Sequence, residues 1–462
     1  MLFNSLPFLY GFLPVTYLVF WRLKHKNDRY IWLTLTGYVF YAFWDYRFCG
    51  LMAVSTVLAY AAGLGLRVWE SAQLRRLCLI VPITIDLCLL GFFKYATLGL
   101  ETANRVAAWL DVPLFLSGPH IILPVGISFY TFHTISYVVD AYRRTIVPTR
   151  SFFEFSCYVS LFSQLVAGPI VRFRQIETDL EYIGRRGPGR TWHLGWSFFA
   201  IGMIKKVLIA DTIAAVIDPA LARHETLSTA TAWLCMLGYA YQIYFDFSGY
   251  SDMAVGLGYL FGIRIPQNFN SPYRATDPSD FWRRWHISLS TCLRDYLYIP
   301  LGGSQSGRWR TYRNILITML LGGLWHGASW TFVAWGAYHG LLLIGYRAAR
   351  PGWDALPVAL RRSATFGLVV VGWVLFRATS FDMALDLLGS MFVPTAGAAV
   401  AGTIGLLMAV AVAAVAAHSS RNTFELSHRW SPATGLSLAA LFAACLLVLY
   451  AGRDTPFLYF QF

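Results

Sequence analysis

Hydrophobic residues gather along this chain into long runs that are separated by short polar segments. A helix needs roughly 20 mostly apolar residues to cross the hydrocarbon core of a bilayer. The runs therefore predict an all-α polytopic membrane protein with about ten to twelve spans and little room for a soluble domain. The predicted spans and half-spans are residues 6–21, 30–44, 48–66, 77–93, 121–139, 152–170, 193–210, 228–247, 314–325, 328–346, 363–378, 398–417 and 433–451.

The composition agrees with a membrane protein. Of the 462 residues, 57% are hydrophobic and 13% are charged, and the mean hydropathy is +0.51. A soluble domain normally carries about 25% charged residues. The run 6–21 has neither a basic leader nor a small-residue cleavage site, so we expect it to be retained as the first helix. The seven cysteines form no Cys-x-x-Cys pair, which predicts neither a disulfide framework nor a metal site.

The net charge of +13 does not indicate nucleic-acid binding, because the basic residues lie in short loops and not on one continuous face. Basic loops between spans are expected in the cytoplasm. Among the first five loops only the odd-numbered ones are strongly basic, which places the N-terminus outside the cytoplasm. Counting onward places the tail after residue 450 outside as well. The later basic groups predicted to be cytoplasmic are Arg308, Arg310 and Arg313, and then Arg361 and Arg362.

Two segments near the middle of the chain depart from this order. Residues 94–120 are more polar and include Pro113 and Pro119, which predicts an extracytoplasmic loop with a short surface helix. The basic loop 172–190, with Arg185 and Arg186, fits only if the run 152–170 enters and leaves the membrane by the cytoplasmic face. That run is interrupted by Gln164, Gly168 and Pro169, and it therefore predicts a re-entrant segment that lines a cavity.

Region 249–313 mixes aromatic, charged, Gly and Pro residues in a way that no lipid-facing span tolerates. Within it, 280–300 predicts an amphipathic helix with Ser279 or Asp280 as its N-cap. One face carries Trp282, Trp285, His286, Leu289, Leu293 and Tyr296. The segment by itself favours an interfacial helix anchored by tryptophans. The functional alternative places His286 at the rim of an active-site cavity.

His326 is the one imidazole in the apolar run 319–335. A polar ring at membrane depth is costly and by default marks a functional site. The flanking glycines allow a close approach of backbone or ligand, and they allow the helix to break beside a cavity. The glycines are Gly322, Gly323 and Gly327, and the expected walls of the cavity are Trp325 and Trp330. The alternative is a structural histidine that joins two helices by hydrogen bonds.

Other polar residues have simpler explanations. The loop 301–307 and the arginines after it, Arg308, Arg310 and Arg313, could hold the phosphates of a nucleotide-bearing acyl donor, but an ordinary cytoplasmic turn has the same composition. Asp246 and Asp252 could bind a cation, although a helix cap or buried arginine partners are the simpler interpretation. We expect Asp140 to pair with an arginine, and we expect the two remaining histidines of interest, His133 and His339, to serve packing.

Histidine suits the transfer of an acyl group to a hydroxyl. A hydroxyl is a poor nucleophile until a base removes its proton, and imidazole can take that proton near neutral pH and return it to the leaving group. Such a base contributes about 10²–10⁴-fold in rate. The chain has no Gly-x-Ser-x-Gly elbow, so direct attack of the acceptor on the donor is favoured over a serine acyl-enzyme.

Several motifs in consistent order resemble the membrane-bound O-acyltransferase family, and within it the alginate O-acetyltransferase branch. They are residues 123–132, 167–172, 246–254, 268–270, 280–303, 312–314, 321–330 and 456–462. The resemblance covers nearly the whole chain. It implies that His326 is the catalytic histidine and that His286 takes part as well. We expect no bound metal, because the cysteines lack zinc-binding spacing.

The same resemblance implies a ring of about 11 transmembrane helices plus re-entrant segments around a central tunnel. Residues 1–462 would form one acyltransferase domain, with peripheral spans in 1–120, a catalytic core in 121–346 and C-terminal spans in 363–462. It also implies acetyl-CoA as a cytoplasmic donor, with no permanently bound cofactor. The acetyl group would pass across a bacterial inner membrane towards an exported polysaccharide, with a periplasmic acetyltransferase as partner.

Two other functions compete with this prediction. One is transfer of a D-alanyl or other acyl group to a cell-wall polymer. The other is a transporter of lipid-linked sugars that performs no chemistry. A transporter predicts internal symmetry and many intramembrane charges; we find no internal repeat, and Asp86, Lys205 and Lys206 are among the few candidate charges.

Overall fold

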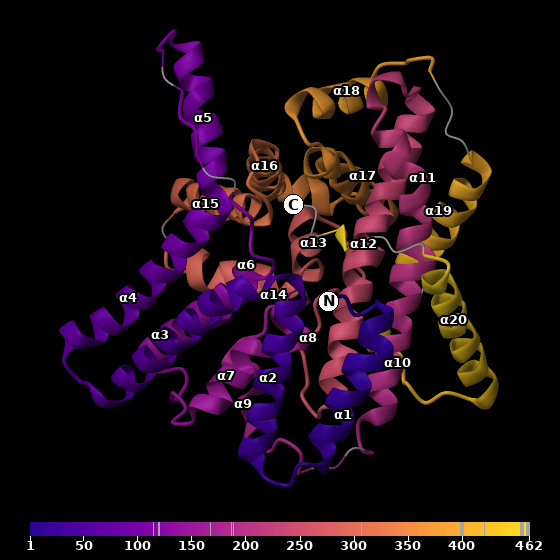
Figure 1. The fold of residues 1–462 in the computed structure, drawn as a ribbon. Coiled ribbons are helices and arrows are strands. Elements are labelled where there is room, and N and C mark those ends of the chain that lie inside the picture. Colours follow the sequence, from indigo (N-terminus) through magenta and orange to yellow (C-terminus); the bar gives the residue numbers. More distant parts are fainter. Residues whose placement is uncertain are drawn as a thin grey trace. The chain divides into compact units, whose positions relative to one another are not determined.

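A computed structural model gives the fold (Figure 1). It describes residues 1–113, 115–118, 121–166, 168–185, 187, 189–305, 307–397, 402–419, 421–452 and 457–458. Within these ranges every regular element is a helix, as the apolar runs predict. The features named above that lie wholly or partly outside the described residues include Pro119, Arg186, the stretch 94–120, the motif 167–172, the loops 172–190 and 301–307, the predicted span 398–417 and the tail 456–462, of which only Phe457 and Leu458 are described.

The chain divides into two compact units. The first comprises Met1, Pro7–Thr191 and Gly258–Ile265. Its helices are α1 (Leu13–Arg22), α2 (Lys26–Asp45), α3 (Cys49–Val68), α4 (Ala72–Leu90), α5 (Ala96–Trp109), α6 (Ile127–Tyr142), α7 (Phe152–Ser160), α8 (Phe162–Leu165) and α9 (Phe173–Glu181). A short π-helical stretch, Phe8–Phe12, precedes α1, and another, Gly91–Tyr95, joins α4 to α5.

The second unit comprises Leu2–Leu6, Trp192–Leu257 and Pro266–Phe462. Its helices are α10 (Trp192–Met203), α11 (Asp211–Leu221), α12 (Thr229–Leu260), α13 (Pro278–Arg284), α14 (Ile287–Leu293), α15 (Arg308–His326), α16 (Trp330–Asp354), α17 (Val358–Arg377), α18 (Phe381–Phe392), α19 (Thr403–His418) and α20 (Pro432–Tyr450). Both candidate catalytic histidines belong to this unit.

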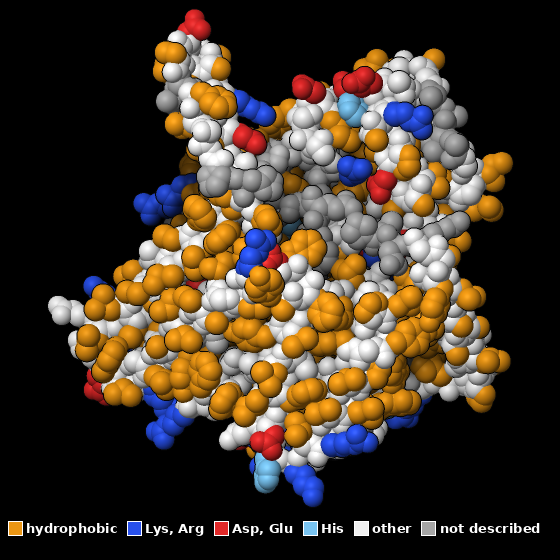
Figure 2. All heavy atoms as spheres, in the orientation of Figure 1, with side chains coloured by type: hydrophobic (Ala, Val, Ile, Leu, Met, Phe, Trp, Pro, Cys, Tyr) orange, Lys and Arg blue, Asp and Glu red, His pale blue; other side chains and the backbone are white. Residues whose placement is uncertain are grey.

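Among the described residues, four helical runs are long and apolar enough to cross a membrane by length and composition: Lys26–Val68, Ala72–Trp109, Val358–Arg377 and Pro432–Tyr450. They contain the predicted spans 30–44, 48–66 and 77–93, and the spans 363–378 and 433–451 each end one residue beyond the matching run. Large apolar side chains are exposed along these helices, and Figure 2 shows how they dominate the face over α2, α3 and α4. They include Leu35, Val39 and Phe43 on α2, Val54 and Val57 on α3, and Leu77 and Ile80 on α4.

Two predictions for the first unit need correction. The polar stretch 94–120 is not mainly a loop. Its first part is helical, because α5 continues α4 through the π-helical stretch, as Figure 1 shows. The run 152–170 is broken, as predicted, because α8 ends at Leu165, before Gly168 and Pro169. A further break, which comes earlier than Gln164, was not predicted. It lies at Leu161, between α7 and α8.

In the second unit, α12 continues as a helix to Leu260, beyond the end of the predicted span 228–247. Residues 249–258 are buried, which agrees with a region that cannot face lipid. Its small and charged residues are tolerated there because they meet partners. A Cβ on Gly249 would lie 2.7 Å from the Gly202 carbonyl oxygen, so α12 and α10 cross at these glycines. Asp252 Oδ2 lies 2.6 Å from Lys205 Nζ, which compensates its buried charge.

The amphipathic helix predicted at 280–300 is also wrong in detail. The chain forms α13 and α14 with a break at Trp285 and His286, where His286 has a left-handed φ of 43°. The N-cap of α13 is Asp277, whose side chain accepts the Asp280 N–H at 2.7 Å, and not Ser279 or Asp280. The residues before and after this break therefore do not lie on one face of a single helix, contrary to the sequence-based prediction.

Candidate active site

His326 is the last residue of α15, and Gly327 ends the helix with extended backbone. The predicted break is therefore present. Its ring is nearly buried and lies among aromatic side chains, with the centroids of Trp335 and Trp325 each 5.0 Å away and that of Phe376 5.2 Å away. These rings come from α15, α16 and α17, so three helices fix the position of the imidazole.

The two helices beside His326 approach each other through glycine. A Cβ on Gly323 of α15 would lie 2.2 Å from the Phe332 carbonyl oxygen, and one on Gly336 of α16 would lie 2.3 Å from the Met319 carbonyl oxygen. Only hydrogen atoms fit at these positions, because real Cβ contacts do not come that close. The glycines near His326 therefore set the spacing of α15 and α16.

His286 is fully buried between α13 and α14, and a side-chain amide orients its ring. Its Nδ1 lies 3.1 Å from Asn268 Oδ1, which also accepts from the Ser288 hydroxyl at 2.8 Å and from the Ser288 N–H at 3.2 Å. An amide oxygen only accepts, so this arrangement favours a proton on Nδ1 and leaves the lone pair of the neutral imidazole on Nε2.

The two histidines lie close together, as the motifs imply. Their ring centroids are 6.4 Å apart, and the Trp325 ring lies near both of them. Phe247 of α12 also packs edge-on against His286, with centroids 4.7 Å apart. The second unit thus brings together two imidazoles that are 40 residues apart in the chain, within a shell of aromatic rings.

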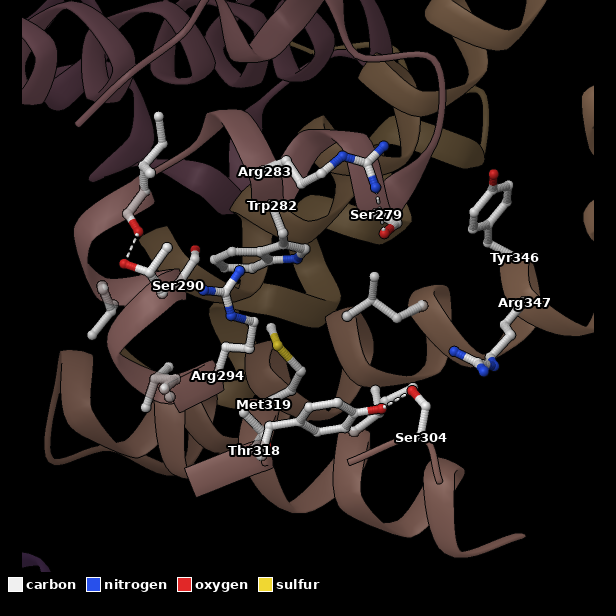
Figure 3. Close-up of a pocket in the computed structure, with 18 of the residues that line it drawn as sticks. Ser279, Trp282, Arg283, Ser290, Arg294, Ser304, Thr318, Met319, Tyr346 and Arg347 are labelled. Carbon is white, nitrogen blue, oxygen red and sulfur yellow. Dashed lines mark hydrogen bonds between the residues drawn. The ribbon is translucent and has the colours of Figure 1, made fainter. Parts of the chain in front are cut away.

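A cavity of about 770 Å³ has His326 in its wall. Its lining comes from α13 to α16 and includes Trp282, Ser290, Thr318, Met319, Gly322 and Trp335. Four arginines also line it: Arg283, Arg294, Arg347 and Arg350; no aspartate or glutamate is among the described lining residues. Figure 3 shows Arg294 and Arg347 reaching in from opposite sides. This volume is within the usual range for a small-molecule site, about 300–1,000 Å³.

The arginines of the cavity differ in their ion pairing. Arg294 Nε lies 2.7 Å from Asp295, Arg350 Nε lies 3.2 Å from Asp354, and Arg283 lies 3.4 Å from Asp280. For Arg347 no carboxylate lies within 4 Å in the part of the chain that the structure describes. The cavity therefore offers positive charge beyond what the neighbouring carboxylates neutralise.

The arginines predicted from the sequence, Arg308, Arg310 and Arg313, are not among the cavity-lining residues. They lie in the first two turns of α15, at the opposite end of that helix from His326. The predicted walls also differ: Trp282 and Trp335 line the cavity, and Trp325 and Trp330 do not. None of the lining residues belongs to 152–170.

Several supporting residues have clear partners. Asp246 pairs with Lys206 at 2.6 Å and Asp252 with Lys205 at the same distance, so the basic partners of these carboxylates are lysines and not the arginines expected. Asp140 pairs with Arg174 at 3.7 Å, as predicted.

His339 and His133 are packed among aromatic side chains, as predicted. His339 is buried with its ring centroid 4.8 Å from that of Trp335, and His133 is buried 5.4 Å from Tyr158. In the described part of the chain, one group has ligand atoms close enough to hold a metal ion: His224, Glu225 and Asp386. It contains neither candidate catalytic histidine.

Sequence reasoning missed Asn268 as the partner of His286, although it recognised the 268–270 motif. It also missed the four arginines of the cavity. Arg347 and Arg350 are three residues apart on α16, a spacing that places both on one helix face. The sequence could have shown from this spacing that the two arginines share a helix face, but not that this face borders a cavity.

Comparison with known proteins identifies the family of this chain. The model of the membrane-bound O-acyltransferase family matches residues 113–385, which include both histidines and the whole cavity lining. The chain belongs to this family, and it is an O-acyltransferase.

Within the family, the chain is similar to proteins that are named as acetyl-transferring enzymes. The chain is 41% identical, over the full length of both chains, to a probable alginate O-acetylase AlgI of Azotobacter vinelandii. It is 44% identical to the corresponding protein of Pseudomonas aeruginosa, over 85% of this chain and 75% of that one. A peptidoglycan O-acetyltransferase of Helicobacter pylori is 38% identical over 85% of this chain and 80% of its own.

Proposed function

We propose that this protein transfers an acetyl group from acetyl-CoA, bound on the cytoplasmic side, towards the hydroxyl groups of an exported, alginate-like polysaccharide. The observation that carries the proposal is the position of His326, in the wall of a cavity lined by four arginines and by no described carboxylate. A base and an anion-binding surface thus share one cavity. The names of the most similar relatives support the acetyl group and a polysaccharide acceptor.

In the proposed reaction His326 acts as general base. It takes the proton of the attacking hydroxyl while the oxygen bonds to the carbonyl carbon of the thioester, and the proton then passes to the sulfur as the carbon–sulfur bond breaks. His286 lies 6.4 Å away, centroid to centroid, with its Nδ1 oriented by Asn268. His286 is not among the residues that line the cavity. In the proposed reaction it assists the proton transfer as a second imidazole close to His326.

The proposed donor fits the charge of the cavity. Acetyl-CoA carries several phosphates, and arginine recognises phosphate through paired N–H donors. Arg283, Arg294, Arg347 and Arg350 would hold these phosphates, which would direct the acyl end towards His326. Arg308, Arg310 and Arg313 stay as proposed outer contacts on the first turns of α15. A charged donor cannot cross hydrocarbon, so the acyl group alone would be handed across the membrane.

The remaining parts of the proposal follow the family. Residues 1–462 would act as one domain, a ring of about 11 transmembrane helices around a tunnel, with the catalytic core in 121–346. The protein would lie in the bacterial inner membrane with its N-terminus outside the cytoplasm and a periplasmic acetyltransferase as partner. Transfer of D-alanine to a cell-wall polymer is the alternative; the acetyltransferase names of the relatives reported above favour acetate.

The test is His326→Gln in cells that make the polymer, with His339→Gln as the matched control. Both rings are buried, and both lie about 5 Å from Trp335 by centroid distance. We expect His326→Gln to lower polymer acetylation by about 10²-fold or more at normal protein level and normal polymer export, because the general base is lost. His339→Gln should keep most of the acetylation.

Unchanged acetylation in His326→Gln would refute the assignment of this residue. Loss of polymer export together with acetylation would favour a transporter. His286→Ala, measured beside them, separates the two roles proposed for the second imidazole: equal loss makes it a catalytic partner, and a milder loss makes it a residue that shapes the site.

A further inference from the structure

Residues 457–458, near the end of the chain, contact α12 beside a residue that packs against His286. The Leu458 N–H donates to Asp246 Oδ2 at 2.8 Å. The Phe457 ring lies 4.5 Å from that of Tyr250 and 5.9 Å from that of Phe247, centroid to centroid. Phe457 is fully buried, so these contacts belong to the interior of the second unit.

The carboxylate that receives the tail is part of a buried ion cluster. Asp246 Oδ1 lies 2.6 Å from Lys206 Nζ, which lies 2.7 Å from Asp211 Oδ1. The side chains of Lys206 and Asp246 are each 2% exposed. A buried carboxylate is costly unless it is paired and hydrogen-bonded, and here one lysine serves two carboxylates. The tail N–H therefore gives Asp246 a second donor that the lysine alone does not supply.

The same turn of α12 connects the tail to the site. Phe247 follows Asp246 in the chain, and its ring packs edge-on against His286, with centroids 4.7 Å apart and an interplanar angle of 88°. Phe457 contacts Phe247 as well. Asn268 orients the same imidazole through its Nδ1 atom. Phe247 thus provides a packing surface for the imidazole that is separate from the hydrogen bond of Asn268.

We propose that residues 457–458 form a latch, a short tail segment that fixes α12 so that Phe247 holds His286 in its working position. Asp246, Phe247 and Phe457 are then positioning residues for the transfer reaction, since they act through His286. The kinetic consequence rests on the proposed function. The expected effect on the position of the His286 ring is independent of that function, because this effect concerns only the packing of the protein.

The sharpest test removes a single backbone donor. Proline has no N–H, so Leu458→Pro deletes the hydrogen bond to Asp246, while Leu458→Ala shortens the side chain and keeps the bond. We expect kcat for acetyl transfer in isolated membranes to fall about tenfold or more in Leu458→Pro, because a hydrogen bond to a buried charge is lost, with the KM for acetyl-CoA unchanged. Leu458→Ala also removes buried apolar area, so it measures the effect of the lost side chain, and its kcat should fall less than that of Leu458→Pro.

A second readout follows the ring itself. The full-length protein is treated with diethyl pyrocarbonate, and modified His286 and His326 are quantified by mass spectrometry. We expect the ratio of modified His286 to modified His326 to rise severalfold in Leu458→Pro and to stay at the wild-type value in Leu458→Ala. His326 borders the cavity and serves as the internal reference.

Equal kcat and equal modification ratios in the two Leu458 variants would overturn the latch. If Leu458→Pro does not accumulate in the membrane, Phe457→Ala replaces it, with Phe457→Leu as the conservative variant expected to restore both readouts. Failure of the proposed function is distinguishable: a wild-type chain without acetyl transfer would refute that function, while the modification ratio would still decide whether the latch holds His286.

Discussion

At the scale of single residues, the site depends on backbone positions that are unusual for their side chains. His286 has a φ of 43°, a left-handed conformation that costs a non-glycine residue about 1–2 kcal/mol. The Ile287 N–H bonds to the Asn268 carbonyl oxygen at 2.9 Å, and the Asn268 side chain holds both His286 and Ser288. These bonds offset the local strain. They also explain why the residue departs from the helical pattern expected from the sequence.

The prediction at this scale concerns the donor site. Arg347→Gln should raise the KM for acetyl-CoA about tenfold with kcat unchanged, because it removes a charge-assisted contact to phosphate that is the same in the bound and transition states. The measurement is initial rate against acetyl-CoA concentration in isolated membranes. The variant should also weaken the dependence of KM on ionic strength.

Arg362→Gln is the matched control, since Arg362 is an exposed arginine of the same unit that does not line the cavity. Its KM should equal that of the wild type. If both variants shift the KM equally, the donor's phosphates do not bind in this cavity, and the proposed donor site is wrong.

At the scale of elements, the close approach of α15 and α16 decides where His326 points. Gly336→Ala would place a Cβ 2.3 Å from the Met319 carbonyl oxygen, and backbone at that distance has to move. We expect a loss of about 1–3 kcal/mol in unfolding free energy, since overpacking has that typical cost. The detergent-solubilised protein should therefore show a lower Tm. Acetyl transfer should also fall, because a shift of α15 displaces His326, the last residue of that helix.

Gly345→Ala is the control on the same helix. A Cβ at Gly345 meets nothing within 4 Å, so the alanine should leave activity unchanged and stabilise α16 by about 0.5–1 kcal/mol through its helix propensity. A Tm for Gly336→Ala at or above that of Gly345→Ala would contradict the tight crossing.

The long membrane-spanning helices could be predicted from the sequence wherever the length and hydrophobicity of an apolar run are enough to define them. The spans within α2, α3, α17 and α20 follow from apolar runs that need no tertiary partner to be recognised. The continuation of α12 to Leu260 was not predictable in that way. Its Gly249 and Asp252 resemble loop residues until the facing Gly202 and Lys205 are known.

At the scale of the whole molecule, the charge pattern predicts an orientation in the membrane. The helical run Ala72–Trp109 has 38 residues, so at 1.5 Å per residue it is roughly 57 Å long, well above the roughly 30 Å of hydrocarbon. Its two ends should therefore lie on opposite sides of the membrane. The basic loop before it is predicted to be cytoplasmic, which places its far end outside.

Cysteine labelling checks this prediction. A membrane-impermeant maleimide should label Asp111→Cys in intact cells with a permeable outer membrane, and it should label Glu70→Cys only after the inner membrane is opened. Both positions are exposed in the first unit. The unsubstituted chain gives the background from its seven cysteines. The reverse labelling pattern would invert the proposed topology.

The sequence by itself determined that this chain is helical and belongs in a membrane, because long apolar runs leave no other way to satisfy the backbone. It also singled out His326, because a lone imidazole in such a run is costly without a use. Only the tertiary structure decided the rest of the site: Asn268 beside His286, the arginines opposite each other across a cavity, and the tail on Asp246. These pairings join residues from distant parts of the chain. They depend on how helices cross and break, which no local pattern of hydrophobic and polar residues records.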